Sequence, residues 1–321
     1  MTKVSVIMPV LNEEHHLADA VDSVLKQNFE GELLIALGPS TDGTNKVAAE
    51  LARKDSKIRL VENPRGLTTV GMNLCIEKAQ HDVIVRIDAH SEPAPNYIKR
   101  GLEILAERNA DLLGGVMAAK GKTLFQRSVA WGYNSPFGLG GATYHVGGEA
   151  GEAESAYLGI FRKSALERVG GYDESIIRGE DWELAQRIKA TGGLVWFSPE
   201  LSVTYWPRST WTGLAKQFYS TGVWRGDLSR RSPKTTSLRY FIPPALVLSL
   251  LVGNFLATLG FTIGWAPVWA YFIPVIFLGF ISKLAPTPLV LATMHLSWGA
   301  GFIIGFFKGA AGTLDRSRVT K

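Results

Sequence analysis

The last third of the chain is almost free of charge, and this feature limits the possible folds more than any other. From Tyr240 to Phe307 the only formal charge is Lys283, whereas acidic and basic residues are interspersed before residue 240. About 20 apolar residues cross a bilayer, and this stretch is far longer than the core of a small domain. The sequence therefore predicts a soluble domain over residues 1–207 and a transmembrane region of two or three helices over residues 240–308.

Three apolar stretches make up that region, and they leave the number of membrane crossings open. The middle stretch is short and contains Pro274, so it either spans the bilayer or re-enters the same face. A basic tail over residues 309–321 favours a cytoplasmic C-terminus and an even number of crossings, because lysine and arginine collect on that side. Three stretches favour an odd number. They are Tyr240–Gly264, Val268–Ser282 and Leu289–Phe307.

A basic segment over residues 208–239 precedes the apolar region. Its apolar residues between Trp211 and Trp224 predict an amphipathic helix in the membrane interface or, alternatively, a surface helix packed on the domain. Such a segment is attracted to anionic lipids, and no recognition module indicates nucleic acid as a partner. The cations are Arg208, Lys216, Arg225, Arg230, Arg231, Lys234 and Arg239, with Asp227 the lone acid among them.

Two features bear on the cellular location. Met1–Val10 lacks a basic region followed by a long apolar one, so no cleavable secretion signal is expected. The single cysteine, Cys75, allows no internal disulfide, which agrees with a reducing compartment. We therefore expect a multi-pass protein of the cell membrane whose soluble domain lies in the cytoplasm.

Strands and helices alternate through the first 90 residues, which predicts an α/β fold with a doubly wound, mostly parallel sheet. Ligands bind such sheets beyond the carboxyl ends of the strands. Polar residues at Asn12–Glu14, Gly38–Thr44 and Asp88–His90 follow expected strands, so they should converge on one pocket. These strands are Val4–Val10, Glu32–Leu37, Ile58–Glu62 and Asp82–Ile87.

The rest of the soluble domain predicts further strands and one irregular stretch. Gly132–Glu152 is rich in glycine and should form a mobile loop near the site. A helix is expected over Trp182–Ala190. The strands expected here are Leu112–Ala118, Ala156–Phe161, Leu194–Phe197 and Leu201–Tyr205.

Asp88 and His90 are candidate ligands for a divalent metal, Mg²⁺ or Mn²⁺, that would neutralise the diphosphate of a nucleotide-linked substrate. Hard cations prefer oxygen ligands, and manganese also accepts imidazole. Residues i and i+2 of an extended turn face the same way, so these two side chains can share one ion. The structural alternative is a helix-capping aspartate and a solvated histidine.

Asp181 is the candidate general base, because transfer of a sugar with inversion needs a carboxylate to take the proton of the acceptor. Asp181 follows Glu180 and is two residues from Glu183, and mutual repulsion among the three carboxylates can raise the pKa of one of them towards neutrality. The alternative is the first turn of a helix, which favours acids. Asp42 is expected to cap a helix or to hold a nucleotide. Arg65 and Arg86 either offer cations to the diphosphate or form structural ion pairs.

Together these segments resemble the family 2 inverting glycosyltransferases, which have a nucleotide-sugar-binding fold of the GT-A type. The resemblance covers about residues 3–205. It rests on five segments in order: Val6–Glu14, Ser40–Thr44, Asp88–His90, Val169-Gly170-Gly171-Tyr172-Asp173-Glu174 and Gly179–Trp182. It implies that Asp88 and His90 match the metal-binding Asp-x-Asp of the family and that Asp181 matches its catalytic base. It also places Pro9, Asn12 and Glu14 beside the nucleotide. On the acceptor side we place Glu180, Trp182, Trp224 and Arg225.

Two departures from the family pattern limit what the resemblance implies. Leu37-Gly38-Pro39 stands where the family usually has an acid that reads the nucleotide, so the base stays open. The Gln-x-x-Arg-Trp motif of processive synthases is replaced by Gln217-Phe218-Tyr219-Ser220, which favours addition of a single sugar.

The membrane region and the Asp-Ala-His variant look most like succinoglycan-type exopolysaccharide glycosyltransferases, which act on lipid-linked sugars. The leading hypothesis is therefore transfer of one sugar from a nucleotide sugar to a polyprenyl-diphosphate-linked acceptor. Transfer to polyprenyl phosphate is the alternative within this class. A non-catalytic membrane component of an envelope-assembly complex is the alternative outside it. A dehydrogenase is disfavoured, because no glycine-rich phosphate turn follows Val10.

Overall fold

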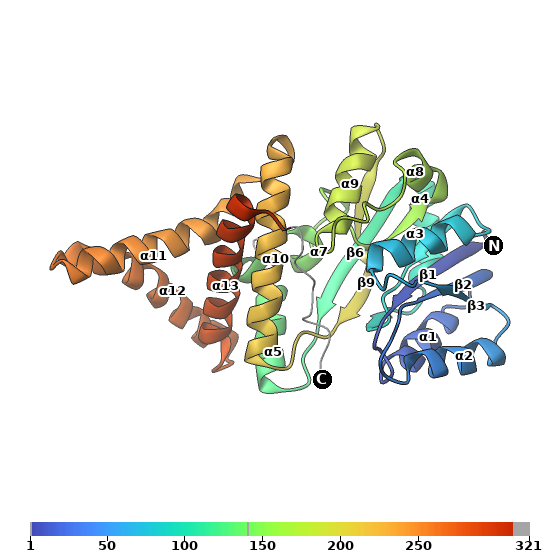
Figure 1. The fold of residues 1–321 in the computed structure, drawn as a ribbon, viewed down its shortest axis with the longest axis horizontal. Helices are drawn as coiled ribbons and strands as arrows, with labels where there is room; N and C mark the ends of the chain where they lie inside the picture. Colours follow the sequence, from blue (N-terminus) through green and yellow to red (C-terminus); the bar gives the residue numbers. More distant parts are fainter. Residues whose placement is uncertain (1, 140, 311–321) are drawn as a thin grey trace. The chain divides into compact units, whose positions relative to one another are not determined.

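The computed structural model describes residues 2–139 and 141–310, and these form two compact units. The sheet unit comprises residues 1–118 and 143–205. The helical unit comprises residues 119–142 and the chain from Trp206 onward. The boundary predicted at residue 207 therefore lies close to Tyr205, but residues 119–142 belong to the helical unit (Figure 1).

The sheet unit contains one mixed sheet with the strand order β3-β2-β1-β4-β8-β6-β9-β5, and β7 pairs with β9. The first four strands in this order are parallel, as the alternating pattern predicted, whereas β8 runs antiparallel to β4 and β6. The strands are β1 Val4–Val10, β2 Gly31–Leu37, β3 Ile58–Glu62, β4 Val83–Arg86, β5 Ser91–Pro93, β6 Leu112–Ala119, β7 Gly151–Glu152, β8 Tyr157–Arg162 and β9 Val195–Tyr205.

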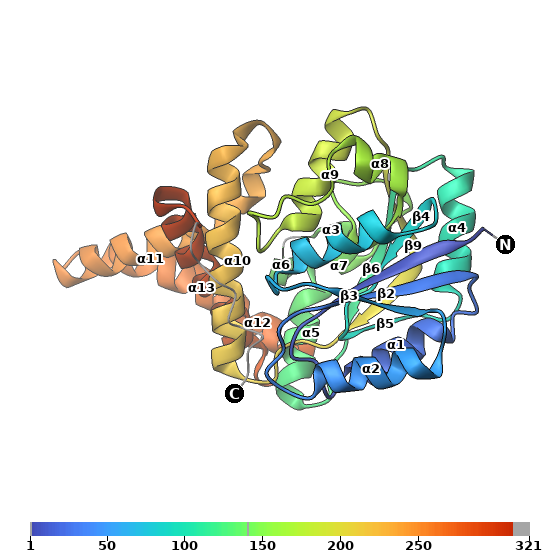
Figure 2. The same ribbon diagram turned by 45° about the vertical axis from the view of Figure 1, so that its right-hand side comes forward.

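Helices cover both faces of this sheet, and each face has its own apolar core. Helices α1, α2 and α4 supply core residues on one face, and α3, α8 and α9 supply them on the other (Figure 2). Because both faces are buried, the central strands are continuous apolar runs, as in Val6–Met8. The helices are α1 Leu17–Leu25, α2 Thr44–Lys54, α3 Thr68–Lys78, α4 Tyr97–Glu107, α7 Thr143–Val146, α8 Lys163–Arg168 and α9 Glu180–Ala190.

The sheet unit differs from the sequence prediction in two places. The two strands expected over Leu194–Phe197 and Leu201–Tyr205 are one strand, β9, because the exposed Pro199 and Glu200 keep an extended backbone between them. Within the stretch expected to be a loop, Gly132–Glu152, the described residues include the short elements α6, α7 and β7.

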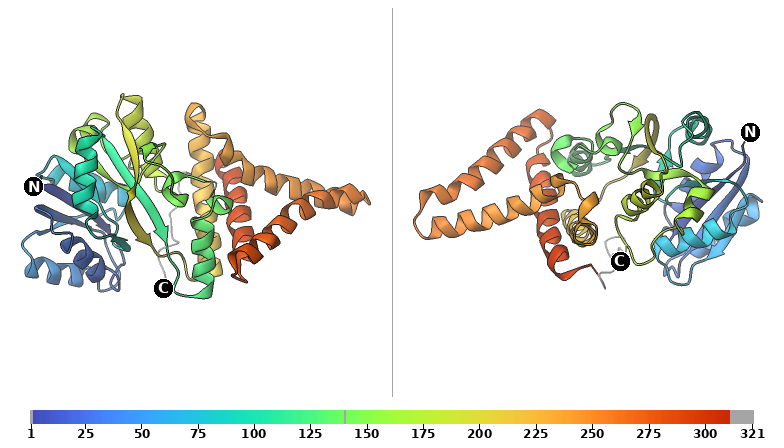
Figure 3. Two further views of the ribbon diagram at one scale, coloured as in Figure 1. Left: turned by 180° about the vertical axis from the view of Figure 1, so that it is seen from behind. Right: turned by 90° about the horizontal axis from the view of Figure 1, so that it is seen from above.

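The helical unit contains the apolar third of the chain (Figure 3). Three of its helical segments are long and apolar enough to cross a membrane: Leu238–Thr258, Thr262–Ser282 and Thr287–Lys308. The middle one is helical throughout its length despite Pro274. The basic tail predicted at 309–321 lies, from residue 311 on, outside the described residues. The helices are α5 Leu124–Tyr133, α6 Pro136–Leu139, α10 Trp211–Arg231, α11 Ile242–Thr258, α12 Ala266–Ser282 and α13 Thr287–Lys308.

Helix α5 was not expected, although the sequence carries a signal for it. Thr123 and Gln126 form a capping box, in which each side chain accepts a hydrogen bond from the backbone of the other residue. This Thr-x-x-Gln pattern is a known marker of a helix start.

Candidate active site

The loops that follow β1 and β2 are tied together by the polar residues expected to bind the nucleotide. Asn12 donates its backbone N–H to Ser40 Oγ (3.1 Å) and accepts from the backbone of Thr41 (2.8 Å). Glu14 accepts from the N–H of Gly43 (3.0 Å). Their observed role is to hold two strand ends together at one edge of the sheet. Contact with a nucleotide stays a prediction for Asn12 and Glu14.

Asp42 and Pro9 have local roles at the same edge. Asp42 Oδ1 accepts from the N–H of Thr44 (3.0 Å), the first residue of α2, while Gly43 occupies the N-cap position between them. Pro9 lies in β1 beyond the part that pairs with β4, since that pairing ends at Ile7 and Arg86. The two strands therefore part before Pro9, which opens the edge of the sheet where a ligand is expected.

Arg86 is the centre of the site, and its guanidinium contacts three carboxylates. The residue ends β4 and is 3% exposed. Its Nε and Nη2 donate to the two oxygens of Asp88, at 3.0 and 3.4 Å. Its Nη1 donates to Asp181 Oδ1, and Nη2 also reaches Glu180 Oε1 at 3.3 Å. All three nitrogens thus bind the protein itself, so Arg86 joins the end of β4 to the start of α9.

Helix α9 carries the two carboxylates that meet Arg86. The helix starts after Gly179, whose φ of +81° turns the chain at a conformation that favours glycine. Glu180 and Asp181 occupy its first turn, where the helix dipole favours acids. Glu183 points elsewhere and pairs with Arg187 at 2.6 Å. Two of the three clustered carboxylates therefore belong to the site.

The charges in this cluster perturb one another strongly. Burial raises the pKa of the Asp181 carboxyl to about 8, Arg86 opposes this shift, and Glu180 and Asp88 add to it. The pKa of Arg86 stays above its usual value although burial opposes this, because Asp181 and Asp88 lie beside it. A quarter of the Asp181 side chain remains exposed. A carboxylate with these properties is suited to accept a proton near neutral pH.

Tyr172 completes the cluster and was not among the predicted site residues. Its ring lies against Arg86, with the guanidinium carbon 5.9 Å from the ring centre. Its side chain is buried beside Arg86, with which its hydroxyl interacts. Burial raises the pKa of this hydroxyl, so it remains a potential proton donor. Tyr172 lies in the Gly-Gly-Tyr-Asp-Glu segment that contributes to the family resemblance, but the sequence of this segment does not reveal which way the ring points.

His90 faces a carboxylate that the sequence prediction left out. Its Nδ1 lies 3.4 Å from Glu13 Oε1, and both side chains are mostly buried. Such a contact orients the ring and leaves Nε2 for a metal ion. No cluster of three or more His, Cys, Asp and Glu side chains suited to a metal occurs among the described residues. A metal held by Asp88 and His90 would then complete its ligands with phosphate oxygens and water.

Arg65 is half exposed and forms an ion pair with Glu174. This links the loop after β3 to the Gly-Gly-Tyr-Asp-Glu segment, as the structural alternative predicted. Its contact with a diphosphate stays a prediction.

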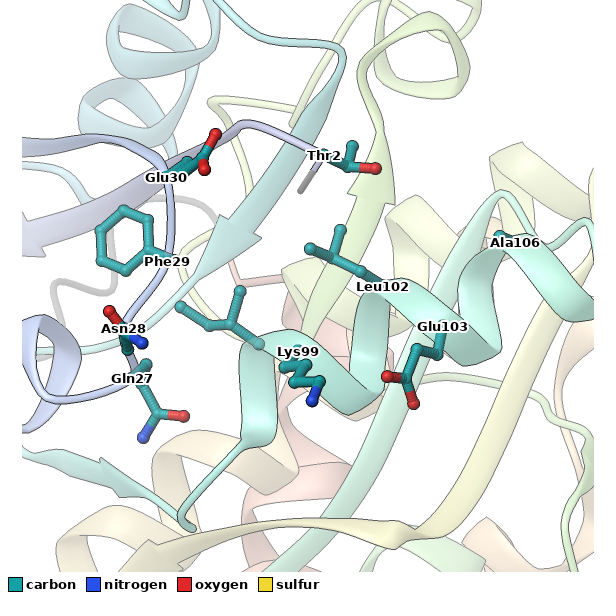
Figure 4. Close-up of a pocket in the computed structure, with 10 residues that line it drawn as sticks. Thr2, Gln27, Asn28, Phe29, Glu30, Lys99, Leu102, Glu103 and Ala106 are labelled. Carbon is teal, nitrogen blue, oxygen red and sulfur yellow. The ribbon is translucent and has the colours of Figure 1, made fainter.

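A separate pocket of about 300 Å³ lies at the other end of the parallel strands (Figure 4). It is lined by residues that precede β1 and β2, including Thr2 and Phe29, and by one side of α4, including Leu102. Because ligands of such sheets bind at the carboxyl ends of the strands, this pocket is not the candidate active site.

Comparison with known proteins identifies the family. A sequence profile described as glycosyl transferase family 2 matches residues 5–170, just over half of the chain. The chain belongs to glycosyl transferase family 2. It is therefore a glycosyltransferase, and inversion of configuration is typical of its family. The family and the GT-A-like fold expected from the sequence are confirmed.

Two curated relatives extend beyond the matched residues. The chain is 29% identical over 307 residues to the succinoglycan biosynthesis protein ExoA of Rhizobium meliloti, covering 92% of this chain and 93% of that protein. It is 24% identical over 242 residues to the dolichyl N-acetyl-alpha-D-glucosaminyl phosphate 3-beta-D-2,3-diacetamido-2,3-dideoxy-beta-D-glucuronosyltransferase of Methanococcus voltae, covering 72% and 75%.

Solved structures of low sequence identity share the fold. The mannosyltransferase PcManGT from Pyrobaculum calidifontis, in complex with GDP-Man and Mn²⁺, matches with a TM-score of 0.61 at 18% identity, over 94% of this chain and 86% of that one. S. aureus TarS in complex with UDP matches with a TM-score of 0.51 at 16% identity, over 91% of each chain.

The residues predicted for the acceptor side of this glycosyltransferase fall in both units. Glu180 and the buried Trp182 lie on α9 of the sheet unit. Trp224 and Arg225 lie on α10 of the helical unit. There Trp224 is 2% exposed, and Arg225 lies over the ring of Tyr240 at 4.4 Å. Their contact with an acceptor stays a prediction.

Proposed function

We propose that this glycosyltransferase moves one sugar from a nucleotide-sugar donor to a polyprenyl-diphosphate-linked acceptor, in envelope or exopolysaccharide synthesis. One observation carries the proposal. Arg86 joins Asp88, expected on the donor side, to Asp181, expected on the acceptor side, in a single buried cluster. Catalysis of transfer depends on holding both reactants together, and this bridge fixes the distance between the two groups that would act on them.

Asp181 is assigned as the base that takes the proton of the acceptor hydroxyl. Arg86 holds Asp181 through Oδ1, and we assign Oδ2 to the incoming hydroxyl. Glu180 shares the same arginine and keeps a second negative charge close by, which favours uptake of a proton by Asp181. The two carboxylates and the arginine thus set both the position and the basicity of the reacting oxygen.

The residues on the nucleotide-sugar side of the site offer ligand atoms that suit a divalent cation. Asp88 offers carboxylate oxygens whose direction Arg86 fixes, and His90 offers an imidazole that Glu13 orients. A bound Mg²⁺ or Mn²⁺ would neutralise charge on the leaving diphosphate. The chain's own part is to hold these two ligands still at the edge of the sheet. The Mn²⁺ and GDP-Man in the complex of the structurally similar mannosyltransferase support a nucleotide-sugar donor.

The lipid-linked acceptor is supported by two observations. The helical unit offers three helices long and apolar enough to cross a membrane. Two relatives match beyond the sheet unit. One is named for succinoglycan biosynthesis and matches 92% of this chain, and the other is named for a dolichyl phosphate-linked sugar and matches 72%. We place the sheet unit on the cytoplasmic side of the cell membrane, because the basic segment 208–239 directly precedes the apolar helices. Membrane lipids are then further partners.

The kcat/KM for the acceptor is expected to rise with pH, to be half-maximal at about pH 8 and to level off roughly one pH unit higher. Below its pKa of about 8, Asp181 is protonated and cannot accept the proton of the acceptor, so the active form gains population as pH rises. The groups facing it are Arg86, Glu180, Asp88 and Tyr172. The measurement is kcat/KM for the acceptor from about pH 5.5 to 10, because this ratio reports the pKa of the base before the acceptor binds. A flat profile across this range would exclude Asp181 as a base with a raised pKa.

Donor binding is expected to depend on a divalent metal held by Asp88 and His90. Asp88→Ala should remove metal-dependent binding of the nucleotide sugar, and His90→Asp should keep it while shifting preference towards Mg²⁺, because carboxylate is the harder ligand. Calorimetry of Mn²⁺ and Mg²⁺ binding in the presence of donor checks both variants. His16→Asn is the matched control, since His16 is exposed and precedes α1. Unchanged donor binding after thorough chelation contradicts this assignment.

A further inference from the structure

Helix α13 differs from the other two candidate membrane spans in how much protein covers it. In its most apolar window 44% of the residues are buried, compared with 11% in each of the other two spans. The cover comes mainly from α10, which runs beside α13 in Figures 1 and 3, and to a smaller extent from α11, α5 and α12 of the same unit. Since lipid-facing helices need apolar surface rather than protein cover, this contrast raises the question whether all three helices cross.

Helices α10 and α13 run in the same direction at very close approach. A Cβ atom on Gly301 would collide with the carbonyl of Tyr219, and one on Gly305 would collide with the carbonyl of Val223. From the other side, a Cβ on Gly226 would collide with the backbone of α13. Glycine on both helices thus allows backbone contact over two turns, so α10 must accompany α13 wherever α13 lies.

This register brings charge to the level of the apolar part of α13. Lys216 lies about one turn before Tyr219, hence level with the middle of α13, and its side chain is exposed. Further along, the charges of Arg225 and Asp227 lie level with the last turns of α13. If α13 crossed the bilayer, α10 would place Lys216 close to the membrane centre on a lipid-facing surface, where a charge is very unfavourable.

The first half of α13 contacts α12, where the Tyr271 hydroxyl lies 2.9 Å from His295 Nδ1, and it also contacts two segments that are not membrane spans. His295 of α13 contacts the backbone carbonyl of Phe137 in α6 at 2.8 Å. Gly132 of α5 lies so close that a Cβ atom there would be 2.9 Å from the sulfur of Met294. Helix α5 carries the exposed Arg127. Helices that carry exposed charge, α5 and α10, thus pack on α13 together with the uncharged α11 and α12.

Helices α11 and α12 show the opposite character. They form a hairpin, closed by tight contact between Gly253 and Gly264, whose far end projects away from α10 and α13 (Figures 1 and 3), while Pro243 of α11 and Gly279 of α12 pack on α13. No charged residue occurs between Ile242 and Ser282. Their large apolar side chains are exposed on many sides, as expected of surface that faces lipid. These include Leu251, Phe255, Trp269, Ile273, Phe277 and Phe280.

We propose that α11 and α12 cross the membrane as a two-pass hairpin, while α13 stays with α10 in the interface on the side from which α11 enters. The free side of α13 suits this place, since its exposed Leu289, Ile304 and Phe307 can lie among the acyl chains near the surface. Lys308 then returns to the side of the basic segment, as lysine and arginine prefer. This inference rests on the membrane location in the proposed function.

Cysteine labelling in the full-length protein tests the arrangement. Cys75 is completely buried, so the wild type gives the unlabelled background. Single cysteines replace exposed residues at Lys26, directly after α1 of the sheet unit, at Phe261 between α11 and α12, at Ala285 between α12 and α13, and at Lys308. A membrane-impermeant maleimide is applied to right-side-out and to inverted vesicles, and retained sugar transfer shows that each variant folds.

The proposal expects Lys26→Cys, Ala285→Cys and Lys308→Cys to react from one side and Phe261→Cys from the other. Labelling of Lys308→Cys from the side of Phe261→Cys would mean that α13 crosses, and labelling of Phe261→Cys together with Lys26→Cys would mean that the hairpin does not cross. Either result overturns the proposal and leaves the proposed reaction intact. Release of the protein by carbonate washing would instead remove the membrane location on which both rest.

Discussion

Replacing Asp181 by asparagine is expected to reduce sugar transfer by about 10²–10⁴-fold while donor binding stays near that of the wild type. The amide keeps the shape of the carboxylate and can still meet Arg86 through its oxygen, but it cannot take the proton of the acceptor. The measurement pairs kcat for transfer with the affinity for the nucleotide sugar. Loss of both together would indicate a structural role for Asp181.

The matched control for Asp181→Asn is Glu183→Gln, which changes a carboxylate in the same turn of α9. Glu183 contacts Arg187 and not Arg86, so its replacement removes an ion pair along the helix and leaves the buried cluster intact. Turnover of Glu183→Gln is expected to stay close to the wild type. If Asp181→Asn also turned over normally, Asp181 would have no part in the mechanism.

Replacing Arg86 by methionine is expected to destabilise the sheet unit by about 3–5 kcal/mol, because buried carboxylates would lose their shared cation. The loss should be largest at high pH, where the buried Asp181 is ionised and has lost its cation. It should shrink as pH falls, because protonation of Asp181 removes the buried charge that Arg86 balances. Hydrogen exchange at β4 and α9 of the full-length protein in detergent reports this stability.

Arg100→Met is the control for Arg86→Met, since Arg100 also contacts three carboxylates, those of Glu103, Glu107 and Glu200. These contacts are solvent-exposed, where ion pairs contribute little. A much smaller and nearly pH-independent effect is expected there. Equal effects of the two substitutions would mean that the Arg86 cluster is no more than a surface ion-pair network.

Local patterns in the sequence predicted most of the elements that build the site. Apolar runs located β1, β2, β3 and β4, and the polar residues after them do lie at strand ends. The role of Arg86 could not be read in this way, because it depends on α9 folding back onto β4 from more than 90 residues along the chain. The sequence offered a diphosphate contact as one role for Arg86, but in the structure its nitrogens are taken up by carboxylates.

The same limit applies to the helical unit. The amphipathic spacing of Trp211–Trp224 correctly predicted a helix. Such spacing does not indicate which helix packs on its apolar side, and that helix is α13, about 80 residues later in the chain. Residues 119–142 were assigned to the soluble domain because they follow β6 in the chain. They belong with the apolar helices because α5 and α6 pack on α13, a contact between distant segments that no local pattern records.

The most direct test of the proposed function is transfer by the full-length protein in liposomes. A panel of labelled nucleotide sugars is supplied with polyprenyl-diphosphate-linked sugar or with polyprenyl phosphate, and the Asp181→Asn variant runs in parallel. The account predicts metal-dependent transfer of one sugar from one donor to the diphosphate-linked acceptor, with inverted configuration at the transferred carbon and about 10²–10⁴-fold slower transfer by the variant. Transfer that retains configuration, or equal product from Asp181→Asn, would contradict it.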